Sequence, residues 1–326
     1  MLRILDFNMW SGLTYLGFLR MGQYGDESLL RQRRHTMLTL IRKYDPDVVC
    51  LHEVNPLPSA AREIAEALGM DEFHHPHLGG IRIGPVGIPW NLREGDAILA
   101  KPSLRLRPIA RARLSGGYVG RYAAFHFDDA TQILGVTVEI KGKRFPVFST
   151  HWHAGVTAGP DIIKRAAQIV REEGVDQSQI DEALELMRKN AAVRLREANG
   201  TLAFINKHAH GPFILTGDFN AQPDTEEIAC LIRAGLRDAF AERNPRGGAT
   251  WNYKENQHHQ AFYSDYDPNL YLRLNYTRLK QPHRLDYIFY KGKGLKLHSC
   301  KIAMKEKVEG VQASDHFGIL AEFKLP

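Results

Sequence analysis

The chain has 326 residues, with 43 Lys and Arg against 37 Asp and Glu, so its formal net charge is +6. A hydrophobic fraction of 44% and a charged fraction of 25% are typical of globular domains and exclude a predominantly disordered chain. No run of about 18 apolar residues is present, so the sequence predicts no membrane-spanning helix. No signal-peptide pattern follows Met1, and we expect a cytoplasmic protein.

The first half of the chain alternates short apolar runs with amphipathic segments. The periodicity predicts helices over residues 28–43 and 59–68. It predicts strands over residues 2–7, 48–51, 97–100, 121–127, 132–140 and 144–150.

The second half begins with two long helical patterns, over residues 161–173 and 178–208. A third helix is expected at 224–234, and strands are expected at 213–217, 285–290, 295–304 and 317–323. Because no linker separates the halves, we expect one α/β domain over residues 1–326 with a two-sheet core. Within it, residues 155–208 are interpreted as a helical insertion and residues 250–284 as an aromatic and basic loop.

Polar side chains recur where buried strands end or begin. They are Asn8, Glu53, His151, Asp218, Asn220, Asp286, Asp315 and His316. If the four carboxylates among them converge, they repel one another unless a cation or protons neutralise them. An oxygen-rich set favours a hard cation such as Mg²⁺, Mn²⁺ or Ca²⁺, and neighbouring histidines supply proton transfer or positive charge. That combination suits phosphoester hydrolysis.

The same residues stand, in chain order, in motifs that resemble the endonuclease/exonuclease/phosphatase superfamily, which includes deoxyribonuclease I. The motifs are LDFNMWSG, DVVCLHEVN, FSTHWHAG, LTGDFNAQPD, RLDYIFY and ASDHFGI. The resemblance implies an α/β (α+β) fold: a four-layer αββα sandwich with two central mixed β-sheets. The site would lie at one edge of those sheets.

The resemblance also implies residue roles. Glu53, with Asn8 nearby and Asp315 in support, is expected to bind Mg²⁺ or Mn²⁺ ahead of Ca²⁺. Asp218 is expected to orient or deprotonate the attacking water, and Asn220 to position water or phosphate. His316, held by Asp286, is expected to contact the phosphate, and His151 to stabilise the charge that develops on phosphorus.

The substrate stays open at this point. We expect a phosphodiester, with DNA, RNA or a nucleotide-like molecule slightly favoured by the basic balance. A sphingomyelinase-type phospholipase C acting on a lipid headgroup is the alternative, because THWHAG and the downstream Arg194 resemble neutral sphingomyelinases. A phosphomonoesterase acting on a small phosphorylated molecule is a second alternative. The GATWN motif followed by RLDY, by contrast, resembles 5′-tyrosyl-DNA phosphodiesterases.

Further residues are candidates for substrate binding. They are His153, Trp251 and Arg284, with an arginine stripe at Arg105, Arg107, Arg111 and Arg113 whose simpler interpretation is a solvated strand face. The histidine-rich segment His74, His75 and His77 is interpreted as solvated, and His52 as a packed, hydrogen-bonded side chain.

Overall fold

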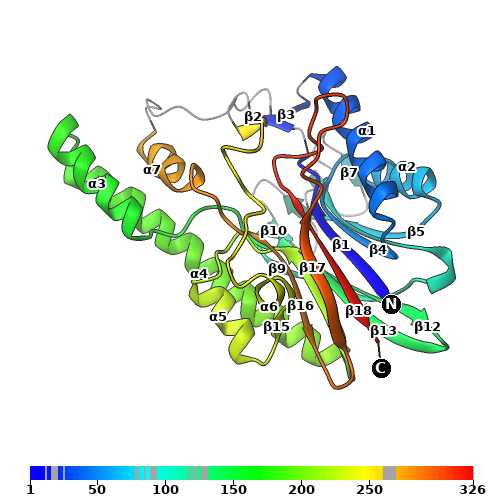
Figure 1. The fold of residues 1–326 in the computed structure, drawn as a ribbon. Helices are drawn as coiled ribbons and strands as arrows, with labels where there is room; N and C mark the ends of the chain where they lie inside the picture. Colours follow the sequence, from blue (N-terminus) through cyan, green and yellow to red (C-terminus); the bar gives the residue numbers. More distant parts are fainter. Residues whose placement is uncertain are drawn as a thin grey trace.

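The computed structural model describes residues 1–11, 13–15, 21–24, 26–77, 81–83, 86–88, 94–116, 118–119, 123–125, 131–259 and 269–325. Within these residues, two six-stranded sheets form the centre of the molecule (Figure 1). The first has the order β17 (Lys296–Ala303), β18 (Gly318–Lys324), β1 (Leu2–Asn8), β4 (Val48–Val54), β8 (Gly95–Ala100) and β5 (Asp71–Pro76). The second has the order β15 (Arg237–Asp238), β16 (Asp286–Lys291), β14 (Phe213–Asp218), β13 (Lys143–His151), β12 (Thr131–Ile140) and β9 (Arg107–Ser115).

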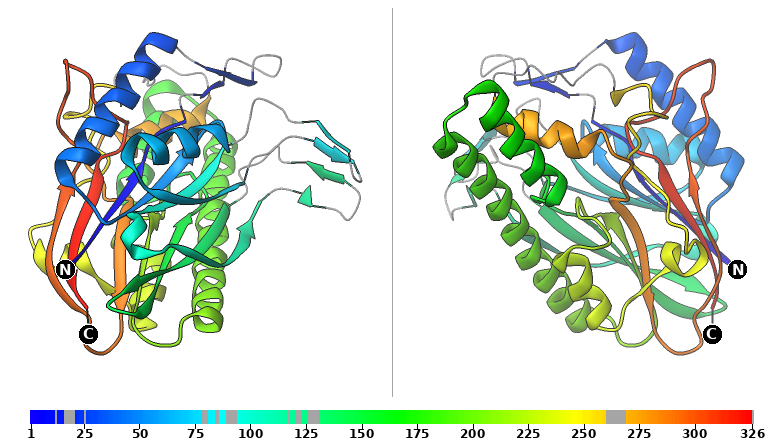
Figure 2. Two further views of the ribbon diagram at one scale, coloured as in Figure 1. Left: turned by 90° about the vertical axis from the view of Figure 1, so that its right-hand side faces the viewer. Right: turned by 60° about the vertical axis from the view of Figure 1, so that its left-hand side comes forward.

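Both central sheets are mixed. Strand β1 runs parallel to β4 and antiparallel to β18, and β13 runs parallel to β14 and antiparallel to β12. Four short strands form a further sheet, in the order β10 (Tyr118–Val119), β11 (Ala123–Phe125), β6 (Ile81–Ile83) and β7 (Val86–Ile88). Figure 2 shows these strands projecting away from the central sheets. Strands β2 (Leu13–Tyr15) and β3 (Met21–Tyr24) form a separate pair.

The two central sheets pack face to face over an apolar core. Ile4 and Ile98 from the first sheet lie in one cluster with Val136, Val147 and Ile214 from the second. Several strands, including β14, are buried along their whole length. Continuous apolar runs are expected for strands covered on both faces.

Helices cover the outer faces and complete four layers (Figures 1 and 2). Helices α1 (Glu27–Tyr44) and α2 (Ser59–Leu68) pack on the first sheet, and α4 (Gln177–His208) and α5 (Glu226–Arg233) pack on the second. The side chain of Asp26 caps α1 by accepting hydrogen bonds from the Ser28 and Leu29 amides. A short helix α6 (Ala239–Arg243) and a 3₁₀ turn (Pro102–Leu104) pack instead against the core between the two sheets. The four-layer sandwich predicted from the sequence is confirmed.

A smaller helical cluster lies beside the second sheet. Helix α3 (Pro160–Glu173), the N-terminal half of α4, and α7 (Leu270–Leu279) share a core that includes Ile162, Ile169, Met187 and Leu274. The first two helices were predicted, whereas α7 falls in a segment where the sequence showed no clear periodicity. Its leucines at positions 270, 272 and 274 alternate with period two, which is the spacing of a strand rather than a helix.

The remaining predicted strands are present within a few residues of their expected bounds, although β11 is the only described part of the predicted strand 121–127. Strand β5 was missed because its sequence, DEFHHP, has no apolar alternation. Among the described residues, no helix is both long enough and apolar enough to span a bilayer.

Candidate active site

A row of polar residues crosses one edge of the second sheet. Asp286 lies opposite Asp218 in the antiparallel register of β16 and β14. Asp218 is in turn beside His151, and His151 is opposite Gln132. Because neighbouring strands lie about 5 Å apart, this register brings two carboxylates and an imidazole to one edge.

The first sheet contributes Asn8 and Glu53 to the same edge. The Asn8 Nδ2 atom donates to Glu53 Oε1 at 2.9 Å and to Asp218 Oδ2 at 3.0 Å, which joins the two sheets. The other Glu53 oxygen accepts from the Ser11 amide at 3.0 Å. Glu53 has φ 56°, and a register shift between Leu51 and Val54 accompanies it. Left-handed backbone at a non-glycine residue costs of order 1–3 kcal/mol and recurs at functional sites.

The Asp218 carboxylate lies between two imidazoles. Its Oδ2 atom is 3.8 Å from the Nε2 atoms of both His151 and His316. Burial raises the pKa of Asp218, but the two histidines and the Asn8 hydrogen bond more than offset it and hold the pKa below its usual value. An ionised carboxylate at this position can accept a proton or orient a water molecule.

Asp286 holds the second of these histidines. Its Oδ2 atom is 2.9 Å from His316 Nδ1, which leaves Nε2 directed toward Asp218. Burial lowers the pKa of His316, but Asp286 and Asp218 raise it well above its usual value. Burial raises the pKa of Asp286 to about 6. We therefore assign the positive charge of this pair to His316 at neutral pH.

Asn220 supports the His151 side of the site. Its Nδ2 atom donates to the Trp152 carbonyl at 3.0 Å and is 3.3 Å from His151 Nε2. Its backbone amide donates to Asp218 Oδ1 at 2.9 Å, and its φ of 47° turns the chain back toward the strand end.

Asp315 is half-buried and lines the same cavity as Glu53, Asp218 and His316. Its Oδ1 atom accepts from Ser314 Oγ at 3.1 Å.

Sequence reasoning missed Arg33, a buried cation near these carboxylates. Its guanidinium group donates to the carbonyls of Met9, Trp10 and Ala313 at 2.7–3.1 Å and lies 4.0 Å over the Trp10 ring. Burial lowers its pKa to about 10, opposed by Asp315 and Glu53, so it stays charged at neutral pH. The available signal was its place on the apolar face of α1, four residues before the buried Met37.

These side chains open into a cavity of about 360 Å³. Glu53, His151, Asp218, Asn220, Asp315 and His316 line it, as do the indoles of Trp10 and Trp251. A further part of its wall includes residues 154–157, three residues of α7 (Asn275, Arg278 and Leu279) and His283. The helical segment that follows His151 therefore begins in the cavity wall.

Helix α4 fixes that wall from behind. Buried Arg194 donates to the carbonyls of His153 and Gly155 and to Thr157 Oγ1, and pairs with Glu227 at 3.3 Å. Asn190 donates to the Tyr271 hydroxyl of α7 at 2.8 Å. Arg194 is thus placed as a support for residues 153–157 and does not line the cavity.

The three residues expected to bind substrate are placed differently from one another. Trp251 lines the cavity, with its ring stacked on His259 and edge-on to His316. His153 instead turns toward α4, where its Nε2 atom is 3.1 Å from Asn190 Oδ1. Arg284 is buried outside the cavity lining, where it forms a bidentate pair with Asp238 and lies 4.2 Å over the Tyr287 ring.

The arginine stripe and the aromatic segment 250–284 lie as follows in the structure. The arginine stripe is the exposed face of the edge strand β9 and the turn before it, with Arg105 paired to Glu139. Of the aromatic residues at 250–284, Phe262, Tyr263 and Tyr266 lie outside the described residues.

The donor set fits a hard divalent cation. Glu53 and Asp218 each present a carboxylate oxygen to the same Asn8 nitrogen, and Asp315 lines the same cavity. Hard cations prefer oxygen ligands of this kind. Asp286 Oδ1, close behind, is buried without a hydrogen-bond partner. The Asn8 oxygen accepts from the Trp10 amide at 2.8 Å, so the amide group faces the two carboxylates with its nitrogen.

Comparisons with known proteins agree with this architecture. The chain is similar in fold to D. rerio TDP2 complexed with single strand DNA product, with a TM-score of 0.60, 16% identity, and coverage of 99% of this chain and 98% of that chain. It is also similar to the human nocturnin catalytic domain with bound sulfate (TM-score 0.54, 17% identity, coverage 100% and 94%). A third similar structure is a Bacteroides thetaiotaomicron mannosyl-6-phosphatase (TM-score 0.56, 15% identity, coverage 100% and 100%).

A search of curated proteins gave no significant match. The sequence profile of the Endonuclease/Exonuclease/phosphatase family, by contrast, matches residues 7–316, which is nearly the whole chain and includes the predicted site residues from Asn8 to His316. The chain therefore belongs to the endonuclease/exonuclease/phosphatase family of phosphoester hydrolases.

Proposed function

We propose that this protein is a metal-dependent phosphodiesterase that acts on the ends of nucleic-acid strands or on nucleotide-like molecules. The observation that carries the proposal is the Asp218 carboxylate, held between His151 and His316 at the base of a walled cavity.

Each residue has a chemical role in the proposed reaction. Glu53 and Asp315 would hold Mg²⁺ or Mn²⁺, which would neutralise charge on a phosphate oxygen. Asp218 orients the attacking water and accepts its proton. His316 is kept protonated by Asp286 and donates a hydrogen bond from Nε2 to the phosphate. His151 and Asn220 stabilise the charge that develops in the transition state.

The shape of the cavity favours a terminal substrate. Residues of helix α7 and residues 154–157 line the cavity together with the carboxylates, and we infer that a strand end enters it more readily than an internal duplex phosphate. Trp10 and Trp251 line the cavity, and contact between an aromatic side chain and a base tolerates any base. The fold likeness to TDP2 with a single-strand DNA product agrees with this choice.

A small phosphorylated molecule is a second candidate, since a cavity of about 360 Å³ holds one without a polymer. The fold likeness to a mannosyl-6-phosphatase is in line with it. In that case a phosphomonoester would be hydrolysed by the same residues.

The test has two parts. Hydrolysis of bis-p-nitrophenyl phosphate should stop with EDTA and return with Mg²⁺ or Mn²⁺, and activity that survives chelation would remove the metal from the proposal.

A substrate panel should then compare linear with circular single-stranded DNA of one sequence, beside duplex DNA, RNA, sphingomyelin and a sugar phosphate. We expect linear strands to be cut from an end and circles to resist. Cleaved circles would contradict the terminal substrate, and cleavage of sphingomyelin or the sugar phosphate alone would replace it.

A further inference from the structure

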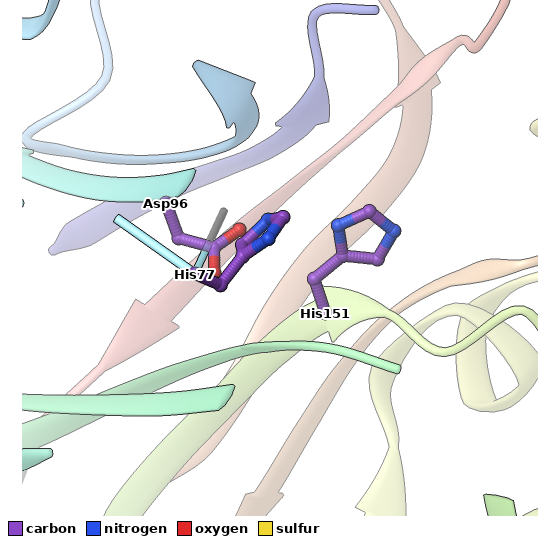
Figure 3. A group of neighbouring side chains, drawn as sticks. All are labelled: His77, Asp96 and His151. Atoms are coloured by element: carbon purple, nitrogen blue, oxygen red, sulfur yellow. The ribbon is translucent and has the colours of Figure 1, made fainter. Parts of the chain in front are cut away.

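Three side chains that are not among the proposed oxygen ligands converge at the same cavity, which two of them, His77 and His151, line. His77 follows the end of β5, Asp96 lies in β8, and His151 ends β13. One donor atom of each lies within 4.8 Å of one donor atom of the other two. Figure 3 shows both imidazoles and the carboxylate turned toward a common space. His77 is 5% exposed and Asp96 fully buried, so the expectation of solvated histidines is wrong for His77.

The carboxylate of this group is held in place by its neighbours. Asp96 Oδ1 is 3.1 Å from His52 Nδ1, and Asp96 Oδ2 accepts from Gln132 Nε2 at 2.7 Å. His52 is held on its other side by Asp6, at 3.0 Å. Outer hydrogen bonds of this kind orient metal ligands and are a regular part of metal sites.

His151 stands between two sets of groups. Its Nε2 atom faces Asn220 and Asp218 at 3.3 and 3.8 Å. Figure 3 shows the other ring nitrogen turned toward His77 and Asp96. One imidazole can therefore bind a cation on one side and face the proposed phosphate position on the other.

The donor chemistry differs from that of the oxygen-rich set. Two imidazoles and one carboxylate are ligands that Zn²⁺ and related transition metals prefer, with bonds of about 2.0–2.2 Å. The Glu94 carboxylate lies 3.9 Å from His77 Nε2 and lines the cavity, so it is near enough to supply a fourth donor after a small movement.

We propose that His77, Asp96 and His151 bind a transition-metal cation of the Zn²⁺ class, in a second metal site next to the proposed Mg²⁺ or Mn²⁺ site. A cation on the near nitrogen of His151 would fix the proton on Nε2. Nε2 would then donate toward the Asp218 carboxylate, 3.8 Å away, and would no longer accept from Asn220 Nδ2.

Metal binding tests the proposal without any assay of hydrolysis. The protein is stripped with EDTA, dialysed, saturated with Mg²⁺ and titrated with Co²⁺ as a spectroscopic probe, and Zn²⁺ is titrated in parallel by calorimetry. We expect one metal ion to bind per protein chain, and the bound Co²⁺ to absorb visible light. His77→Ala should weaken binding about tenfold or more, as loss of a ligand or its support does.

Two control variants locate the cation. His74→Ala, three residues away on β5 and paired with Glu72, should bind as the unaltered protein does. Glu53→Gln should also retain Co²⁺, because it alters the oxygen-rich set. The proposal is overturned if His77→Ala binds Co²⁺ and Zn²⁺ as tightly as the unaltered protein does. It is also overturned if Glu53→Gln loses the visible Co²⁺ absorption while His77→Ala keeps it. Circular dichroism checks folding, and His77→Gln replaces His77→Ala if the latter unfolds.

Discussion

At the scale of single residues, the two sides of the proposed reaction centre should respond differently to mutation. Glu53→Ala removes a carboxylate expected to bind the metal, so Mg²⁺ affinity should fall. His316→Ala should leave Mg²⁺ affinity near normal and lower kcat about 10²-fold or more, because it removes a donor to the transition state. Isothermal titration and steady-state kinetics measure the two effects. The exposed His298 on β17 offers a matched control for the histidine. Near-normal kcat in both variants would disprove the site assignment.

A second residue-scale prediction concerns pH and the buried His52. Burial lowers its pKa, but Asp6 and Asp96, which face it on both sides, raise it well above the usual 6.5. A histidine with a raised folded-state pKa stabilises the fold fully below its unfolded-state pKa and loses that stabilisation as the pH rises through the folded-state pKa. The loss of unfolding free energy in His52→Gln should therefore be largest below about pH 6.5 and shrink at alkaline pH.

Urea unfolding in EDTA across pH 6–10 measures this difference, with His298→Gln as the exposed control. If the loss of unfolding free energy in His52→Gln instead grew toward alkaline pH, the pH dependence would have the opposite sign. His52 would then be neutral in the folded protein.

The site residues that could be located from the sequence lie in local apolar runs, whereas those that were missed are buried by contacts between distant segments. Asn8, Glu53, Asp218 and Asp286 stand at strand ends, where an apolar run predicts burial and a carboxylate in it is conspicuous. Arg284 is also buried, but its partner Asp238 is 46 positions away, and no local pattern indicates such a pair. His77 follows β5, which pairs with β8, and its amide donates to the Glu94 carbonyl, so its burial again depends on contacts that no local pattern indicates.

At the scale of elements, helix α4 connects the second sheet to the cavity wall. Arg194→Met removes a buried guanidinium that binds residues 153–157 and Glu227, and breaking a buried ion pair costs about 3–5 kcal/mol. We expect a drop in unfolding free energy of that order and a higher KM. The control Arg188→Met removes an exposed pair with Glu185 on the same helix and should change stability by less than about 0.5 kcal/mol. Equal stability of the two variants would show that Arg194 does not support the wall.

The elements themselves were largely predictable, since their signals are local. Helix α1 has an Asp cap and an apolar stripe, and β14 is a continuous apolar run between turn residues. Helix α7 was not predictable, because its apolar residues match a strand spacing and its helical form depends on packing against α3 and α4. The part of the wall that narrows the cavity was therefore the part that sequence patterns could not reveal.

At the scale of the whole molecule, the net charge of +6 has a measurable consequence if the substrate is a nucleic acid. Phosphate contacts release counterions, so KM for single-stranded DNA should rise steeply between 50 and 200 mM salt, by about tenfold or more if only a few phosphates are bound. KM for bis-p-nitrophenyl phosphate, with one charge, should change little over the same range. Parallel salt titrations measure both constants, and identical slopes would argue against a polyanionic substrate.

The row Asp286, Asp218, His151 and Gln132 depends on the register of four neighbouring strands. Side chains alternate across a strand, so a slip of one residue in β14 would turn Asp218 away from this row and place Gly217 or Phe219 in it. Hydrolytic activity therefore shows whether these strands have paired in the correct register, because a shift of a single residue would abolish it. In refolding experiments, the recovery of activity compared with the recovery of circular dichroism would measure the fraction of molecules that regain sheet structure in the wrong alignment.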